Sequence, residues 1–208
     1  MASAWNVPGL PFTLSPSAEA AWTITEASAT VTGTAAPHSD IFIDPGSDNP
    51  HDAGSTLDAV TLLGVPPDGD FQFSARVTVE FAATYDAGVL LLWVDDHHWG
   101  KLCFEFSPDD EPMIVSVVAR GVADDANAFA VDGRTVWLRV SRIGPAFAYH
   151  ASLDGEVWRM IRYFAVDGPA TSAMIGFEAQ SPTGDGCVVT FDNIRFTHER
   201  LSDLRNGS

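Results

Sequence analysis

Positively charged residues are scarce in this sequence. Lys and Arg number 11 against 28 Asp and Glu, which gives a formal net charge of −17 at pH 7. Binding to nucleic acid depends on clustered Lys and Arg that displace counterions from phosphates. Anionic membrane surfaces attract proteins through the same kind of cluster. We therefore expect neither nucleic acid nor a membrane as a partner, whereas a sugar or another neutral ligand is compatible with this charge.

Cysteines and long apolar runs are also scarce. The two cysteines, Cys103 and Cys187, lie in unrelated contexts, so neither a disulfide framework nor a zinc site is expected. No apolar run approaches the ~20 residues of a membrane-spanning helix. The opening "MASAWNVPGLPF" lacks a basic start and an apolar core, so no signal peptide is expected. These absences predict a soluble, cytoplasmic protein.

Helical periodicity is almost absent, and short alternating segments recur between Gly, Pro, Asp and Asn. Examples are "DFQFSARVTVEF", "GVLLLWV", "TVWLRVSRI" and "CVVTFDNIRF". About eleven such segments predict strands at the spacing of a β-sandwich. A parallel sheet is excluded because no helical crossovers separate them. We predict one all-β, mostly antiparallel sandwich over residues 1–198, followed by a polar tail at 199–208 that frays or forms a short helix.

The stretch "WGKLCFEFS" has two different faces. Every second residue from Leu102 to Phe106 is apolar, which is typical of a buried strand face. The opposite face carries Trp99, Lys101, Cys103 and Glu105. A solvated strand face more often carries Thr, Ser and Lys. The mixture of apolar and charged side chains therefore favours a partly buried, ligand-binding concavity. A solvated or salt-bridged face is the alternative.

A hairpin would join this stretch to "GVLLLWV" through the turn "DDHH". If Val94 faces Trp99, then Gly88 lies opposite Glu105 and leaves an open space above it. Asp86 then lies diagonal to Glu105 on the same face, at roughly 7–8 Å. The same register assigns these apolar residues to the buried face: Val89, Leu91, Leu102 and Phe104.

Two later strands supply further candidates. In "MIGFEAQSP", alternation directs Glu178 and Gln180 away from the buried face. In "TVWLRVSRI", the same argument directs Trp137 and Arg139 outward. Alternation alone does not decide which outward face meets the candidate groove, and Arg139 can equally be a solvated strand residue.

Catalysis of glycoside hydrolysis requires two carboxylates, ~5–5.5 Å apart for retention and ~6.5–9.5 Å apart for inversion. Asp86 and Glu105 are the candidate pair. Alternatively, Lys101 neutralises Glu105, and the two carboxylates only orient a ligand or each other.

The longest irregular segment covers residues 35–58, and long structured loops are often functional. Its apolar piece "IFI" predicts a return to the sheet. "DPGSDN" offers Asp44, Asp48 and Asn49 as calcium ligands, but turns favour the same residue types. We therefore expect no metal and no cofactor.

Several segments occur in the order found in one protein family. They include "HSDIFIDP", "TYDAGVLLLWVDDHHWGKLCFEFS", "HASLDGEVWRMIRYF" and "VVTFDNIRF". Over residues 5–197 the chain resembles domain-of-unknown-function family 1349, the YesU-like group that includes "regulation of enolase" proteins. The resemblance implies a concanavalin A-like jelly roll of two curved antiparallel sheets with a concave face. It implies no established reaction, and a fold does not determine a function.

The family's short motifs map onto particular positions of this chain. Where many members have Trp after the early Asp, this chain has Ile41 and Phe42, so the resemblance carries no ligand-stacking role to that position. The Glu-x-Asp-x-x-Glu pattern of glucanases with this fold is absent. The matched residues are Ser39, Asp40, Ile41, Phe42, Tyr85, Asp86, Trp99, Lys101, Glu105, Ser181 and Pro182.

The first functional hypothesis is a non-catalytic protein that binds a carbohydrate or another small polar ligand in the concave groove. An aromatic plane would cover a sugar ring and charged or amide groups would bind its hydroxyls. A glycan-active hydrolase or lyase using Asp86 and Glu105 is the second, and a protein-interaction module is the third. A homodimer is compatible with each. The ligand-binding candidates are Asp40, Asp86, Trp99, Lys101, Glu105, Arg139 and Gln180.

Overall fold

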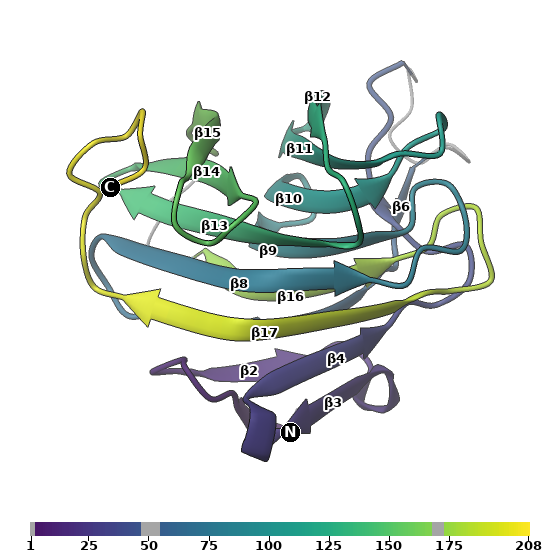
Figure 1. The fold of residues 1–208 in the computed structure, drawn as a ribbon, viewed down its shortest axis with the longest axis horizontal. Coiled ribbons are helices and arrows are strands. Elements are labelled where there is room, and N and C mark those ends of the chain that lie inside the picture. The colour runs from purple at the N-terminus through teal and green to yellow at the C-terminus, as the bar shows by residue number, and fades with distance from the viewer. Residues whose placement is uncertain (1–2, 47–54, 168–172) are drawn as a thin grey trace.

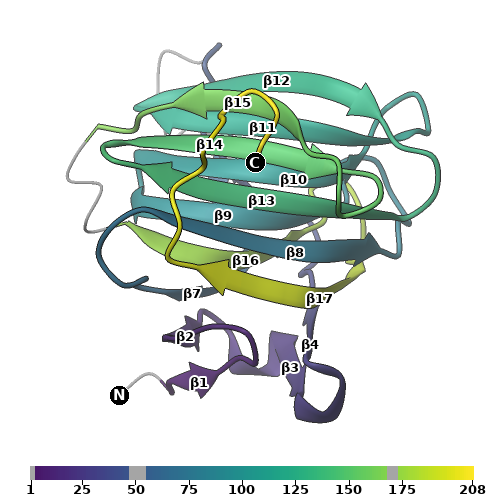
Figure 2. The same ribbon diagram turned by 60° about the vertical axis from the view of Figure 1, so that its left-hand side comes forward.

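The computed structural model describes residues 3–46, 55–167 and 173–208. Within these ranges the chain forms two large antiparallel sheets packed face to face, which confirms the predicted all-β sandwich (Figures 1 and 2). Helical structure in the described ranges is limited to two short 3₁₀ turns, η1 (Glu19–Ala21) and η2 (Glu26–Ser28). None of the described helical segments is long and apolar enough to cross a membrane.

One sheet has eight strands in the order β1-β2-β7-β16-β9-β10-β11-β12. Their bounds are β1 (Trp5–Asn6), β2 (Thr13–Pro16), β7 (Val60–Gly64), β9 (Ala87–Asp95), β10 (His98–Phe106), β11 (Pro112–Arg120), β12 (Val122–Ala130) and β16 (Met174–Gln180).

The other sheet has seven strands in the order β15-β14-β13-β8-β17-β4-β3, and β5 and β6 form a separate pair. Their bounds are β3 (Trp22–Thr25), β4 (Thr30–Thr34), β5 (Ile41–Phe42), β6 (Thr56–Leu57), β8 (Phe71–Val79), β13 (Thr135–Ile143), β14 (Ala146–Ser152), β15 (Arg159–Phe164) and β17 (Val188–Thr197).

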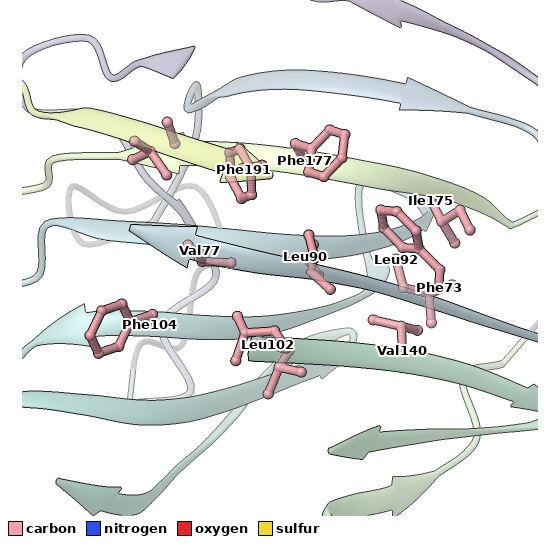
Figure 3. Close-up of a cluster of buried hydrophobic side chains, with 14 of the residues drawn as sticks. Phe73, Val77, Leu90, Leu92, Leu102, Phe104, Val140, Ile175, Phe177 and Phe191 are labelled. Carbon is pink, nitrogen blue, oxygen red and sulfur yellow. The ribbon is translucent and has the colours of Figure 1, made fainter. Parts of the chain in front are cut away.

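The main core lies between the two large sheets (Figure 3). Because strand side chains alternate between faces, each sheet contributes every second residue to this layer. Phe177 of the eight-stranded sheet packs against Phe73 and Phe191 of the other, with ring centroids 5.4 and 4.5 Å apart. Burying one such ring contributes about 1.5–3 kcal/mol. This aromatic layer holds the two sheets together.

Strand β12 was not predicted from the sequence. Its segment "VADDANAFA" lacks a regular apolar alternation because most of its residues remain exposed at the edge of the sheet. It nevertheless pairs with β11 along nearly its whole length. An edge strand pairs on one side only and buries few side chains here, so it does not require the alternation of apolar and polar residues by which strands are predicted.

The expected register of the β9–β10 hairpin is wrong by one residue. It begins as predicted, with His98 opposite Asp95, but the register shifts between His98 and Trp99. Trp99 consequently pairs with Trp93. Such a β-bulge inserts an unpaired residue and redirects every side chain beyond it.

The shift moves Gly88 into the core. Gly88 pairs with Phe104, and a Cβ there would lie 2.5 Å from Val189 and 2.6 Å from Val77. Gly88 therefore does not create an open space above Glu105. Val89 and Leu91, which were predicted to be in the core, instead belong to a second apolar cluster on the outer face of the eight-stranded sheet.

A segment from Ser39 to Ile43 crosses that outer face. At one end Ser39 forms a β-bridge with Ser181, next to β16. At the other end the carbonyl of Ile43 accepts a hydrogen bond from the amide of Ala123 in β12. The predicted return of "IFI" to the sheet therefore takes the form of a strap across its surface. We call residues 39–43 the crossing segment.

The C-terminal tail also packs onto the sandwich. It neither frays nor forms a helix over the described residues, but runs across β13 and β14 in turns (Figure 2). Leu201 is buried against Ile143 and Ala148. Strand β17 ends at Thr197, just before this tail, and the predicted fraying or short helix is not found over its described residues.

The hairpin register can be tested with Gly88→Ala. The added methyl group meets two tightly packed Val side chains, so we expect a loss of about 1–3 kcal/mol in the free energy of unfolding. Chemical denaturation of the variant and the wild type measures this difference. An unchanged denaturation midpoint would support the register in which Gly88 faces the outer surface.

A pocket on the outer face of the eight-stranded sheet

The outer face of the eight-stranded sheet is organised in rows, because paired residues of neighbouring strands point to the same side. One row contains Gln180, Ala87, Glu105 and Met113. The next contains Glu178, Val89, Cys103, Val115 and Asn127. The third contains Gly176, Leu91, Lys101, Val117 and Asp125. Charged side chains thus surround an apolar floor.

Above this floor lies a pocket of about 520 Å³. This volume is within the ~300–1,000 Å³ typical of small-molecule sites. The crossing segment forms one wall, since Ile41 and Ile43 face the sheet while Asp40 and Phe42 line the pocket. The full lining is Asp40, Phe42, Tyr85, Lys101, Glu105, Pro108, Met113, Val117, Asp125, Asn127, Gln180, Pro182 and Thr183.

Lys101 is the best-anchored charged residue of the pocket. Its Nζ donates to Asp40 Oδ1 at 2.7 Å and to Gln180 Oε1 at 2.8 Å. Burial alone lowers the pKa of Lys101, but nearby carboxylates, Asp40 foremost, more than offset this and raise it above its ordinary value. Lys101 is therefore charged, and it ties the crossing segment to β10 and β16.

Gln180 and Asp86 together position Tyr85. The Gln180 amide donates to the Tyr85 carbonyl at 3.2 Å. The Asp86 carboxylate accepts hydrogen bonds from the amides of Ala82 and Ala83 and from the Ser181 hydroxyl. These contacts hold the turn in which Tyr85 has a φ of +69°, an uncommon conformation for a bulky residue.

Asp86 itself is fully buried and does not line the pocket. The expectation that it shares an open groove with Glu105 is therefore wrong. Its oxygens are occupied by the turn that it stabilises. Asp86 acts on the pocket only through the position of Tyr85.

Trp99 lies on the predicted face but does not reach the pocket. Its side chain is completely buried in the outer apolar cluster, and its Nε1 donates to the Asp96 carbonyl at 3.3 Å. The ammonium of Lys101 lies 5.9 Å from the centroid of its ring. The structure thus gives Trp99 no surface on which a sugar can stack, and its contact is with Lys101.

Glu105 and Asp125 are the less anchored charges of the lining. Burial raises the pKa of Glu105 to about 8, against an opposing effect of Lys101. Burial likewise raises the pKa of Asp125. Lys101 lies four residues from Glu105 on one strand, or roughly 13 Å at 3.3 Å per residue. Among the described residues the ion pair of Lys101 is with Asp40, and Lys101 forms none with Glu105.

Glu178 lies on the same outer face, on β16, and is not part of the pocket lining. It is fully buried, and neither carboxylate oxygen has a hydrogen-bond partner in the described part of the chain. Burial raises its pKa to about 8, while Lys101 opposes the shift. An unpaired buried carboxyl is costly in its charged form, so Glu178 holds a proton near neutral pH.

Arg139 is remote from this pocket. It lies on the outer face of the seven-stranded sheet, where its guanidinium packs 4.2 Å from the Trp158 ring centroid and donates to the Gly207 carbonyl. The neighbouring His150 bonds to the Leu204 carbonyl at 2.9 Å. The structure therefore separates Arg139 from the other candidate residues and gives it a role in holding the tail.

Several pocket residues were not among the predicted ones. Asp125 and Asn127 were missed because their strand, β12, was not recognised. Phe42 was discounted because it replaces a family Trp, and Tyr85 was noted only as part of a matched motif. Strand alternation and the family motifs named Asp40, Lys101, Glu105 and Gln180 as candidates, and all four line this pocket.

The pocket offers little to a metal ion. In the described ranges, no group of three or more His, Cys, Asp or Glu side chains is arranged to hold one. Two of the candidate calcium ligands, Asp48 and Asn49, lie outside the described residues.

Burial raises the pKa of the Cys103 thiol well above its ordinary value, which makes this residue an unreactive part of the floor.

The buried carboxyl of Glu178 predicts a pH dependence of stability. Its pKa rises from 4.5 to about 8 on folding, so the native state binds more protons between these values. The contribution of Glu178 to the free energy of unfolding is then fully present below about pH 4.5 and is lost as the pH rises through about 8. We expect Glu178→Gln to reduce this fall, measured by thermal denaturation across the pH range.

The exposed Glu156 provides the control. Glu156→Gln makes the same chemical change and should leave the wild-type pH profile intact. Equal profiles for Glu178→Gln and the wild type would show that Glu178 is ionised in the native state.

A family model described as "Protein of unknown function (DUF1349)" matches residues 17–199. "Regulation of enolase protein 1" of Saccharomyces cerevisiae is 30% identical over 145 residues, covering 69% of this chain and 72% of that protein.

Solved structures share the fold. A functionally unknown protein of Saccharomyces cerevisiae has a TM-score of 0.72 at 23% identity, covering 87% of this chain and 98% of that one. A Bacteroides ovatus GH43 protein of a xyloglucan locus has a TM-score of 0.67 at 14% identity, covering 86% of this chain but 35% of its own. The module CBM66 of Bacillus subtilis has a TM-score of 0.50 at 15% identity, covering 84% and 89%.

The chain thus spans about a third of the GH43 protein, so that likeness concerns one part of a longer chain. The family match extends over most of the present sequence, and the yeast relative is matched over two thirds of it. This chain belongs to the DUF1349 family of proteins of unknown function.

Proposed function

We propose that this protein binds a carbohydrate or a similar small polar ligand in the pocket over β10, β11 and β12, without catalysis. The observation that carries the proposal is the combination of side chains around one pocket of about 520 Å³. Phe42 and Tyr85 offer aromatic surface, while Asn127 and Gln180 offer planar polar groups. Sugar rings have apolar faces and hydroxyl edges, which these two kinds of side chain complement.

The rigidity of the lining supports this proposal. Lys101 is held by Asp40 and Gln180, and Gln180 also holds Tyr85. A pocket formed before the ligand arrives loses less conformational entropy on binding. The structural likeness to CBM66, which is titled a carbohydrate binding module, is consistent with the same ligand class.

The hydrolase alternative has a weaker structural basis. It required Asp86 and Glu105 to flank one open space, whereas the Asp86 carboxylate is buried and engaged by Ala82, Ala83 and Ser181. Glu105 remains in the pocket without that partner. We therefore base the proposal on binding.

Tyr85→Ala tests the proposal. Losing an aromatic contact of ~0.5–1.5 kcal/mol should weaken saccharide binding about threefold to tenfold. Thermal shift against a panel of neutral oligosaccharides first finds the ligand, and titration calorimetry then compares the affinities. The backbone strain at this position is present with either residue, so we expect little change in stability.

Tyr163→Ala is the matched control, because Tyr163 is 50% exposed against 40% for Tyr85 and lies on β15, outside the pocket. It should bind as the wild type does. Equal affinity of the two variants for the ligand would place the binding site elsewhere. No stabilisation by any saccharide would favour a protein-interaction role instead.

A further inference from the structure

The described pocket lining contains more negative than positive groups. Asp40, Glu105 and Asp125 face a single cation, Lys101, whose Nζ already donates to Asp40. Among the described residues Glu105 forms no ion pair with that ammonium, and none of their hydrogen bonds ends on its carboxyl. Glu105 therefore lines the pocket without a partner of opposite charge.

A second, independent observation points in the same direction. Glu178 is fully buried on the pocket side of β16, with both oxygens unpartnered. Its row of paired residues lies between the row that contains Glu105 and the row that contains Lys101. Buried polar groups are nearly always satisfied, so the orphaned Glu178 carboxyl shows that this outer face is short of hydrogen-bond donors. On the same face the Glu105 carboxyl lines the pocket itself and favours a ligand that brings a donor of positive charge.

The geometry favours an organic cation over a metal ion. In the part of the chain that the structure describes, these carboxyls do not form a group that could hold a metal. Strand β11 lies between Lys101 on β10 and Asp125 on β12. The backbones of these two residues are therefore roughly 10 Å apart, two strand spacings. A ligand with one ammonium group and several hydroxyls can engage Glu105 while its ring lies over the apolar floor.

We propose that the pocket selects amino sugars with a free amine, whose ammonium group binds the Glu105 carboxylate while Lys101 and Gln180 contact hydroxyls at the opposite end. This inference rests on the proposed function and names the ligand class for the same pocket. Asp125 adds negative potential without direct contact. The selectivity comes from a carboxylate that gains its counter-ion only when the ligand is present.

Three trisaccharides with the same β-1,4-linked backbone test the proposal. They carry an ammonium group, an acetamido group or a hydroxyl group at C2: chitosan, chitin and cellulose trisaccharides. Titration calorimetry at ~150 mM salt limits nonspecific attraction to the acidic surface. We expect the chitosan trisaccharide to bind about tenfold or more tightly than the cellulose trisaccharide, since charge-assisted hydrogen bonds are strong.

Proton release provides a second readout. Burial raises the pKa of Glu105 to about 8, with Lys101 opposing and Asp125, Asp40 and Glu178 adding to the shift. An ammonium at Glu105 favours the ionised carboxylate, so binding near pH 5.5, where the sugar amine already carries its proton and Glu105 is not yet ionised, should release protons to the buffer. Buffers with different ionisation enthalpies reveal this release, which the cellulose trisaccharide should not produce.

Glu105→Gln should abolish both the preference and the proton release. Glu111→Gln, an exposed residue in the nearby turn and outside the pocket, should leave both intact. Equal or tighter binding of the cellulose trisaccharide would overturn this inference and leave the proposed function standing. Binding of none of the three would contradict both. A preference that survives in Glu105→Gln would show attraction to the acidic surface and overturn the assignment to Glu105.

Discussion

The buried ammonium of Lys101 is the interaction on which the outer face depends. A cation taken out of water requires close acceptors, and Asp40 and Gln180 provide them at 2.7 and 2.8 Å. These two acceptors come from the crossing segment and from β16, so a single charged group joins three parts of the chain. Gln180 extends the network to the Tyr85 carbonyl. Removing Lys101 would leave Asp40 uncompensated and release the wall of the pocket.

The sandwich and the pocket make different demands on the same strands. Inward-facing side chains such as Leu102 and Phe104 build the core by simple burial, which tolerates any well-packed apolar set. The outward-facing residues of the same strand include Lys101 and Glu105, whose charges are expensive to bury. A fold that needed only stability would place apolar or fully solvated residues there. The cost of these groups is the physical reason for assigning the pocket a function.

Sequence reasoning identified much of the fold and four of the thirteen residues that line the pocket. Alternation correctly separated Phe177 from Glu178 and Gln180 on β16, because the period of two is a local property of extended backbone. It failed at the β9–β10 hairpin, where a bulge after His98 reversed the faces of Gly88 and Val89. A bulge depends on packing between strands, and no pattern within either strand signals it. Burial of Trp99 was equally invisible, because its cover comes from residues distant in sequence.

The sequence by itself determined the class of fold, the antiparallel pairing of neighbouring strands and the side of β10 on which Lys101 and Glu105 lie. These features follow from local alternation, turn chemistry and the absence of helical crossovers. Only the tertiary structure decided which charged residues meet. It brought Asp40 to Lys101 across the sheet and Asp125 in on an edge strand with no apolar pattern, and it sent Arg139 to the opposite surface. Contacts between segments far apart in the chain depend on the whole packing, whereas the face of a strand depends on its own backbone.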